Sequence, residues 1–158
     1  AANAHGTGVN VCGEMSGEHR LPPGFVTSTS RGPFTTHNGP LFHKIEGERF
    51  WQGFHVLPRH CNSHGIVHGG WLSAFSDGLL SMAVWRATKT RAVTLRLNAD
   101  FLGMVRPGEW VEGTAHVTRS TRTLAFARAE AACAGRKVLT AEGVFKLMTG
   151  RGGSGPRK

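Results

Sequence analysis

Apolar and polar residues follow one another with two different periods along this chain. Between residues 71 and 88 apolar side chains predominate on almost every side, and Ser73, Asp77 and Ser81 recur at four-residue spacing. Residues spaced in this way share one narrow face of an α-helix. Between residues 93 and 148 apolar and polar residues alternate singly, which is typical of strands with one buried face. The pattern therefore predicts one almost fully enclosed helix followed by a set of strands.

Turn-forming residues divide the remaining pattern into strands. In the strand after the helix, strict alternation places Leu95 and Leu97 on one face and Thr94 and Arg96 on the other. Two short strands, one buried helix and four long antiparallel strands joined by short turns predict an α+β fold, in which one curled sheet wraps around the helix. The expected strands are residues 41–46, 49–57, 93–101, 111–118, 121–132 and 138–148, with a loop at 58–67.

The length of 158 residues suits one domain with a sizeable core. Residues 1–38 are rich in Gly, Pro, Ser and Thr and show no sustained periodicity, which predicts an extended or disordered N-terminal arm. The patterned region predicts a domain at residues 39–149. Residues 150–158 are expected to form a basic, flexible tail.

The sequence contains no sign of a membrane partner or of secretion. No window reaches the roughly 18 uninterrupted apolar residues that a membrane span needs, and residues 1–6 lack the basic-then-apolar layout of a secretion signal. Cys12, Cys61 and Cys133 are an odd number of widely spaced cysteines, which favours reduced thiols over a disulfide framework. These features predict a cytoplasmic protein.

The net charge of +9 brings nucleic-acid binding into consideration. Three of these charges lie in residues 151–158, and the others are spread along the chain without a run or a recognition motif. This distribution favours a solvated surface, or attraction for a phosphate-rich small molecule. A basic nucleic-acid-binding domain remains an alternative, and it predicts an oligonucleotide affinity that falls steeply with salt.

The candidate chemistry is centred on Asp77. An ionised carboxylate among Trp, Phe, Leu and Met is costly unless it is paired, hydrogen-bonded or used in chemistry. His68, Gly69 and Gly70 directly precede the helix, and Asn62 lies six residues before His68. Free N–H groups at a helix start can stabilise an oxyanion, and glycines allow a substrate to approach the backbone closely. Alternatively, Asp77 is a structural acid hydrogen-bonded to a Thr or Ser.

The spacing of Asn62, His68-Gly69-Gly70 and Asp77 resembles the active-site signature of hotdog-fold acyl-CoA thioesterases, in the branch of the phenylacetic-acid-degradation thioesterases. The resemblance covers about residues 39–148. It implies a sheet curled around the helix, and hydrolysis of acyl-CoA thioesters without a metal or other cofactor. It also implies dimers with a continuous sheet, usually paired into homotetramers.

The resemblance also implies roles for single residues. Gly69 would supply the N–H that polarises the thioester carbonyl, Asn62 would orient the carbonyl or the water, and Asp77 would be the general base or the nucleophile. Thr94 falls where the family often has a Ser or Thr near the water. His68 is expected to act as a positioning residue.

Other side chains are candidates for binding the substrate. Arg119 and Arg122, with Lys89 and Arg91, are candidates to hold the phosphates of CoA, although solvated turn charges are an equal alternative. The large aromatic residues either line an acyl pocket or fill the core. They are Trp51, Phe54 and Trp85.

Helix geometry predicts that the site is shared between subunits. Gly69 and Asp77 are eight residues apart, which separates them by about 12 Å along one helix. A reacting atom must lie roughly 3 Å from both the base and the oxyanion donor. We therefore expect Gly69 and Asn62 from one subunit to act with Asp77 and Thr94 from its partner.

A zinc site and a non-catalytic binding module are two alternatives to a metal-free enzyme. His60, His64 and His68, with Cys61, have a spacing that suggests zinc, but the residues between them oppose the helix that this spacing requires, so no metal site is expected. The first alternative to an enzyme is a non-catalytic acyl-CoA-binding hotdog module. Asp77 and Asn62 together argue against that alternative.

Overall fold

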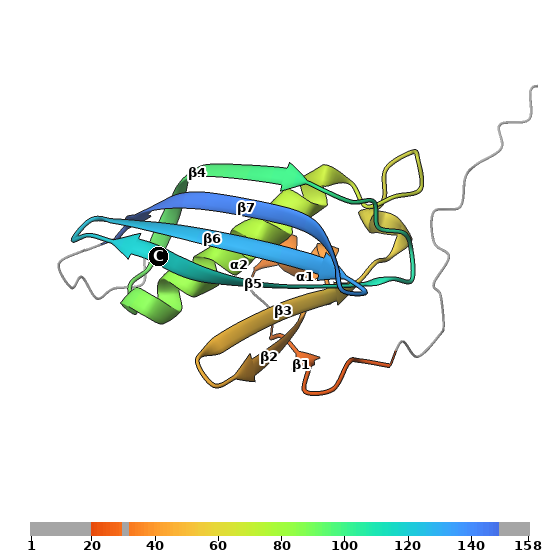
Figure 1. The fold of residues 1–158 in the computed structure, drawn as a ribbon, viewed down its shortest axis with the longest axis horizontal. Coiled ribbons are helices and arrows are strands. Elements are labelled where there is room, and N and C mark those ends of the chain that lie inside the picture. Colours follow the sequence, from red (N-terminus) through yellow and green to blue (C-terminus); the bar gives the residue numbers. More distant parts are fainter. Residues whose placement is uncertain (1–19, 30–31, 149–158) are drawn as a thin grey trace, which may run out of the picture.

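The computed structural model describes residues 20–29 and 32–148. These residues form a seven-stranded antiparallel sheet that curls around one long helix, α2 (Gly69–Thr88) (Figure 1). The predicted α+β class is confirmed, and all six expected strands are present with bounds shifted by a few residues. The strands are β1 (Val26–Thr27), β2 (Phe42–Glu46), β3 (Arg49–His55), β4 (Ala92–Phe101), β5 (Trp110–Ser120), β6 (Leu124–Cys133) and β7 (Arg136–Leu147), and the short helices are α1 (Pro33–Asn38) and the 3-10 turn η1 (Pro58–His60).

The order of strands in the sheet differs from their order in the chain. The sheet runs β1-β2-β3-β5-β6-β7-β4, so β4 pairs with β7 and forms an edge. The expectation of four consecutive strands joined by short turns is therefore wrong for β4. Residues 102–109 carry the chain from this edge back to the middle of the sheet. Val105 anchors the crossing because it is 1% exposed and its carbonyl accepts a hydrogen bond from the N–H of Val67.

Small residues on the inner face of the sheet let α2 pack closely against it. A Cβ on Gly113 would lie 2.8 Å from Leu79 Cδ1, and a Cβ on Gly143 would lie 3.2 Å from Leu80 Cδ1. Both leucines are almost completely buried. The alternation in β6 contributes a row of buried alanines to the same face, Ala125, Ala127, Ala129 and Ala131.

The N-terminal segment contains regular structure that the composition did not predict. Val26 and Thr27 pair with β2, and α1 begins at Pro33. These elements are too short to produce a periodic signal, and tertiary contacts hold them in place. The carbonyl of Asn38 accepts a hydrogen bond from His60 Nε2 at 2.6 Å. Residues 1–19 and 30–31 of the predicted arm, and the predicted tail (150–158), lie outside the described residues.

Candidate active site

The start of α2 leaves one backbone donor free. His68 is the N-cap residue, and its Nδ1 accepts a hydrogen bond from the N–H of Gly70 at 2.8 Å. The N–H groups of Trp71 and Leu72 donate to the carbonyl of His68. Within residues 20–29 and 32–148, the N–H of Gly69 has no acceptor. His68 thus caps the helix, and in the described part of the chain Gly69, rather than Gly70, has the free N–H.

Asn62 lies in the loop that leads into α2. Its N–H donates to the carbonyl of Ile66 at 2.8 Å, and its Oδ1 accepts from the N–H of His64 at 2.9 Å. The loop is closed by an isolated bridge between Cys61 and Val67. The side-chain oxygen of Asn62 is therefore engaged, and its Nδ2 is left as the group that can donate to a substrate carbonyl.

Asp77 lies in the middle of α2 and contacts the edge strand. It is half-buried, and its Oδ1 accepts a hydrogen bond from Thr94 Oγ1 at 2.7 Å. The serines on the same helical face bond back to their own helix: Ser73 donates to the carbonyl of Gly69, and Ser76 donates to the carbonyl of Ser73. Within the polar stripe, Asp77 is therefore the residue whose side chain bonds to another element.

A β-bulge in β4 turns Thr94 toward Asp77. Thr94 pairs with Phe145, Arg96 pairs with Val144, and Leu95 between them has no partner in the ladder. Residues opposite each other in a ladder share a face, and Phe145 is buried in the core. Thr94 therefore faces α2, on the same side as Leu97. The prediction that Thr94 and Leu97 lie on different faces of the strand is therefore wrong, because the extra residue Leu95 reverses the alternation. Bulges often re-aim side chains beside active sites.

The two halves of the candidate site are separated within one chain. A Cβ on Gly69 would lie 3.2 Å from the ring of Phe101, at the end of β4. Asp77 instead meets Thr94, seven residues earlier on the same strand. Seven residues of strand span roughly 20 Å, and eight residues of helix span about 12 Å. A single chain therefore does not bring the Gly69 N–H and the Asp77 carboxylate to one carbonyl.

A cavity of about 180 Å³ adjoins Asp77. It is bounded by α1, β3 and α2. The aromatic residues expected for an acyl pocket are elsewhere: Phe54 is in the core, Trp51 lies beside Lys44, and Trp85 is exposed beside Lys89. The lining residues are Phe34, Thr35, Leu41, Gln52, Trp71, Ala74, Phe75, Asp77 and Gly78.

Gln52 was not found by the sequence reasoning. It is a polar residue whose side chain is 0% exposed. Its position between Phe50 and Phe54 was the available signal, since all three residues share the buried face of one strand.

Three of the four candidate phosphate-binding residues lie at the end of α2 remote from Gly69. Lys89 is the C-cap of α2, and the carbonyl of Arg91 accepts a hydrogen bond from the N–H of Met148. The N–H of Leu147 in turn donates to the carbonyl of Thr123, next to Arg122. Arg119 lines a hollow on the outer face of the sheet together with Arg96 and Arg128. Lys89, Arg91 and Arg122 therefore lie at one end of the fold, about 18 Å along the helix from Asp77.

His60 is a structural residue rather than a metal ligand. Its ring stacks on Trp71 with centroids 4.6 Å apart. Its Nε2 donates to the carbonyl of Asn38, and its Nδ1 accepts from the N–H of Leu57 at 3.1 Å. Burial lowers the pKa of His60, and the nearby Arg59 lowers it further, while the bond to Asn38 opposes them. Both ring nitrogens are engaged, so this neutral imidazole clamps α1 and η1 to the start of α2.

Neither cysteine in the described part of the chain is an activated nucleophile. Cys61 and Cys133 are free thiols, and burial raises the pKa of both. Thiols with raised pKa values are poor nucleophiles at neutral pH because the thiolate is the reactive form. Cys12 lies outside the described residues. No helix in the described part of the chain is long and apolar enough to cross a membrane.

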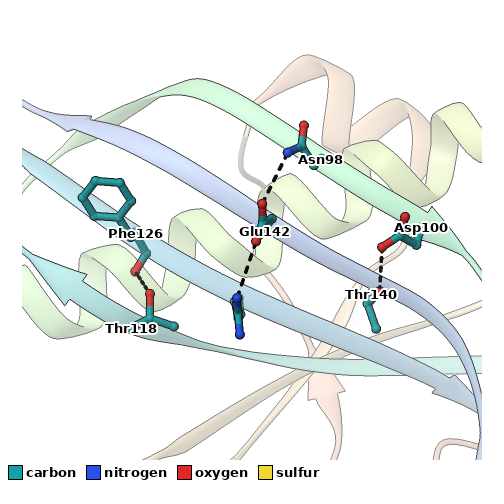
Figure 2. Close-up of polar contacts among 7 residues, drawn as sticks. Asn98, Asp100, Thr118, Phe126, Thr140 and Glu142 are labelled. Atoms are coloured by element: carbon teal, nitrogen blue, oxygen red, sulfur yellow. Dashed lines mark hydrogen bonds and ion pairs between the residues drawn. The ribbon is translucent and has the colours of Figure 1, made fainter.

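A larger hollow, of about 760 Å³, lies on the outer face of the sheet. Four of its polar residues bond in pairs: Thr140 donates to Asp100 and Asn98 donates to Glu142 (Figure 2). The residues lie on the face of the sheet turned away from α2, so this hollow shares no residue with the cavity beside Asp77. We therefore place the candidate site at Asp77.

Comparison with known proteins identifies the class that this fold and site define. Residues 64–140 match the thioesterase superfamily. A Pseudomonas aeruginosa protein whose name places it among esterases is 35% identical over 130 residues, which are 80% of this chain and 97% of that protein. Mouse acyl-coenzyme A thioesterase 13 is 30% identical over 73 residues, which are 46% of this chain and 52% of that protein.

Solved structures agree with the sequence matches. A mutant of phenylacetic acid degradation protein PaaI from Thermus thermophilus has a TM-score of 0.65 and 26% identity, covering 73% of this chain and 98% of that one. A Streptococcus pneumoniae thioesterase protein solved with coenzyme A has a TM-score of 0.63 at 19% identity, covering 70% of this chain and 91% of that one. The chain belongs to the thioesterase superfamily and has its hotdog fold. Thioester hydrolysis is the class of reaction that this membership supports.

Proposed function

We propose that this protein hydrolyses acyl-CoA thioesters to a free acid and CoA, with Asp77 as the acid that acts on water or on the carbonyl carbon. One observation carries the proposal: Asp77 borders a cavity, and its carboxylate is oriented by Thr94 through a 2.7 Å hydrogen bond. A carboxylate held by one donor keeps its second oxygen for a water molecule. The free N–H of Gly69 at the helix start supplies the complementary oxyanion donor.

The reaction follows from these groups. Asp77 removes a proton from water as the oxygen attacks the carbonyl carbon of the thioester, and the carbonyl oxygen becomes an oxyanion that accepts hydrogen bonds from the Gly69 N–H and from Asn62 Nδ2. Collapse of this intermediate breaks the C–S bond, and the CoA thiolate leaves and takes up a proton. Direct attack by Asp77, which forms an anhydride that water then cleaves, uses the same residues.

The exposed edge of the sheet supports a site shared by two subunits. Antiparallel pairing of β4 with a second copy of itself, about a two-fold axis near Asn98, would bring Thr94 of one strand opposite Phe101 of the other. Thr94 contacts Asp77, and Phe101 lies against Gly69. The pairing would thus bring Gly69 and Asn62 of one chain to the Asp77 of its partner, and homodimers of this kind could pair into a homotetramer.

Two observations support CoA as the thiol of the substrate: exposed cations on this chain, and similar structures that were solved with CoA. Lys89, Arg91, Arg119 and Arg122 are exposed cations that we propose to receive the phosphates of CoA. The structures of the Streptococcus pneumoniae protein and of a Bacillus halodurans relative were both solved with CoA. In this arrangement the phosphates of CoA lie at the cations, and the acyl group lies beside Asp77. An elongated acyl-CoA has these two groups at its two ends.

The decisive experiment measures thiol release from a panel of acyl-CoAs by the wild type and by Asp77→Asn. We expect turnover by the wild type, and a fall in kcat of about 10²–10⁴-fold in the variant, which is the usual contribution of a positioned base. Unchanged turnover in a folded Asp77→Asn variant would refute the role of Asp77. Binding of acyl-CoA without turnover by the wild type would favour the non-catalytic acyl-CoA-binding module.

A further inference from the structure

Gln52 has an unusual environment for an amide. It projects from β3 into the interior, its side chain is 0% exposed, and neither Nε2 nor Oε1 has a hydrogen-bond partner among residues 20–29 and 32–148. An unpaired buried amide destabilises a folded protein. Because both atoms are enclosed within one chain, a neighbouring subunit packed on the outside does not reach them. Gln52 also lines the cavity beside Asp77, so a ligand would have to approach its amide from that cavity.

Gly78 faces Gln52 across the cavity. A Cβ on Gly78 would meet Gln52 Oε1 at 3.6 Å, and within 4 Å it would meet no other atom. Glycine in the interior of a 20-residue helix lowers helix stability relative to alanine. A glycine here leaves room directly in front of the unpaired amide. The next residue along the helix toward its N-terminus is Asp77, and Asp77, Gly78 and Gln52 all line the same small cavity.

The cavity has the size of a short acyl group. Its 180 Å³ slightly exceeds the roughly 150 Å³ of an engineered apolar cavity that binds benzene. One ring, or an acyl chain of about six atoms, therefore fits. Much of the remaining lining is apolar, and the indole N–H of Trp71 in the same wall also lacks a partner in the described chain. A mostly apolar pocket with a few polar groups is the usual form of a site that orients its ligand.

We infer that Gln52 is a specificity-determining residue, which selects acyl groups that carry a hydrogen-bonding group at the end remote from the thioester. The inference rests on the proposed function, because it places the thioester carbonyl at Asp77. A short acyl group would then extend into the cavity and bring its far end to Gln52. An amide donates and accepts, so a hydroxyl or a carbonyl oxygen can pair with it. A methyl group at the same place would leave the amide unpaired.

The test compares two acyl-CoAs that differ only at the far end. Hexanoyl-CoA and 5-hydroxypentanoyl-CoA have acyl groups of equal length, with CH₃ in one and OH in the other. We expect the wild type to favour the hydroxylated substrate by about 10–100-fold in kcat/KM, because a site built for a hydrogen bond rejects the analogue that lacks one. Gln52→Met keeps the length of the side chain and removes the amide, and it should abolish or reverse this preference. Gln52→Leu provides a second apolar variant should the first fail to fold.

The outcomes distinguish the inference from the proposed function. Turnover of both substrates with a ratio that Gln52→Met leaves unchanged would overturn the inference and leave thioesterase activity intact. Lack of turnover of every acyl-CoA by the wild type would instead contradict the proposed function, and the inference with it. Thermal unfolding without substrate provides a readout independent of activity. Removal of an unpaired amide should raise the Tm of Gln52→Met by about 2–8 °C, and a lower Tm would reveal a structural partner and overturn the inference.

Discussion

The two edges of the sheet end in opposite ways. At one edge, β1 is only two residues long and pairs with β2, where Lys44 and Glu46 form an ion pair at 3.0 Å. At the other edge, β4 is ten residues long, and Leu95 and Phe101 are 59% and 52% exposed. Short, charged edges prevent strands from pairing with other chains, whereas long apolar edges invite such pairing. We call the edge at β1 and β2 the closed edge, because it is protected from pairing with another chain. We call the edge at β4 the open edge, because it has the features of an interface.

The comparison extends to the two sides of α2. Asp77 bonds to Thr94 on β4, the open edge, while its neighbour Gly78 faces Gln52 on β3, nearer the closed edge. The groups that we propose for chemistry therefore face the edge where a second chain would join. The groups that we propose for recognition of the acyl group are enclosed within one chain.

The largest effect is expected when a charge is placed on the open edge. Leu95→Arg would bury a guanidinium in the proposed interface, at a cost of several kcal/mol. We expect folded monomers and a loss of thioesterase activity of at least about 100-fold, as measured by light scattering, circular dichroism and thiol release. Ile45→Arg is the matched control, because Ile45 is 56% exposed on β2; it should leave both properties unchanged. Equal effects of the two substitutions would contradict the distinction between the edges.

A second experiment tests whether the open edge completes the active site. Asn62→Ala and Asp77→Ala chains should each be inactive alone. After random exchange between dimers, half of the dimers are mixed, and one of their two sites has every native residue, so about a quarter of the wild-type activity should return. Absence of recovery, with exchange verified by differently tagged chains, would place the whole site within one chain.

The sequence predicted much of this fold because its strongest signals are local. The enclosed helix, the alternating strands and the cluster of Asn62, His68-Gly69 and Asp77 all depend on short spacings. The predicted helix began at Trp71, whereas α2 begins at Gly69, because His68 caps it with its ring. A helix cap depends on residues that are neighbours in the sequence, so a local pattern predicts the start of a helix to within a few residues.

The remaining features depend on contacts between distant residues. The bulge at Leu95 reverses the direction of Thr94, and a period-two pattern contains no signal for one extra residue. The position of β4 at an edge depends on its pairing with β7, about 45 residues later in the chain. His60 acquires its role from Asn38 and Trp71, which only the folded chain brings to it. Tertiary structure, rather than propensity, determines each of these.

His60, which joins α1 and η1 to the start of α2, makes the stability of the fold depend on pH. Its pKa is lowered in the folded state, so the unfolded chain binds a proton more readily, and stability is lost as pH falls from about 6.5 toward the folded pKa. Between these values the slope should be at most about 1.4 kcal/mol per pH unit. His60→Ala should remove this component and also lower the free energy of unfolding by about 2–4 kcal/mol, since it leaves the Asn38 carbonyl and the Leu57 N–H unpaired.

Denaturant titrations from pH 5 to pH 8 measure both effects. His64→Ala is the matched control, because His64 is exposed and its bond to Asn62 uses the backbone N–H, which alanine retains. It should keep the pH dependence of the wild type. A His60→Ala protein whose stability falls between pH 6.5 and pH 5 as steeply as that of the wild type would show that another group carries this dependence.

The smallest effect concerns Gly78, on the enclosed side of the helix. Gly78→Ala should raise the free energy of unfolding by about 0.5–1 kcal/mol, because alanine is the better helix former and its Cβ would meet Gln52 Oε1 at an ordinary contact distance of 3.6 Å. The same methyl group would occupy the space in front of the amide. We therefore expect a more stable protein with a several-fold lower kcat/KM for hexanoyl-CoA and little change for acetyl-CoA, which is too short to reach that wall. Because Gly78 faces away from β4, the oligomeric state should not change. A dissociated Gly78→Ala protein would show that the recognition side and the interface side of α2 are not separate, and the division between the two edges would then fail.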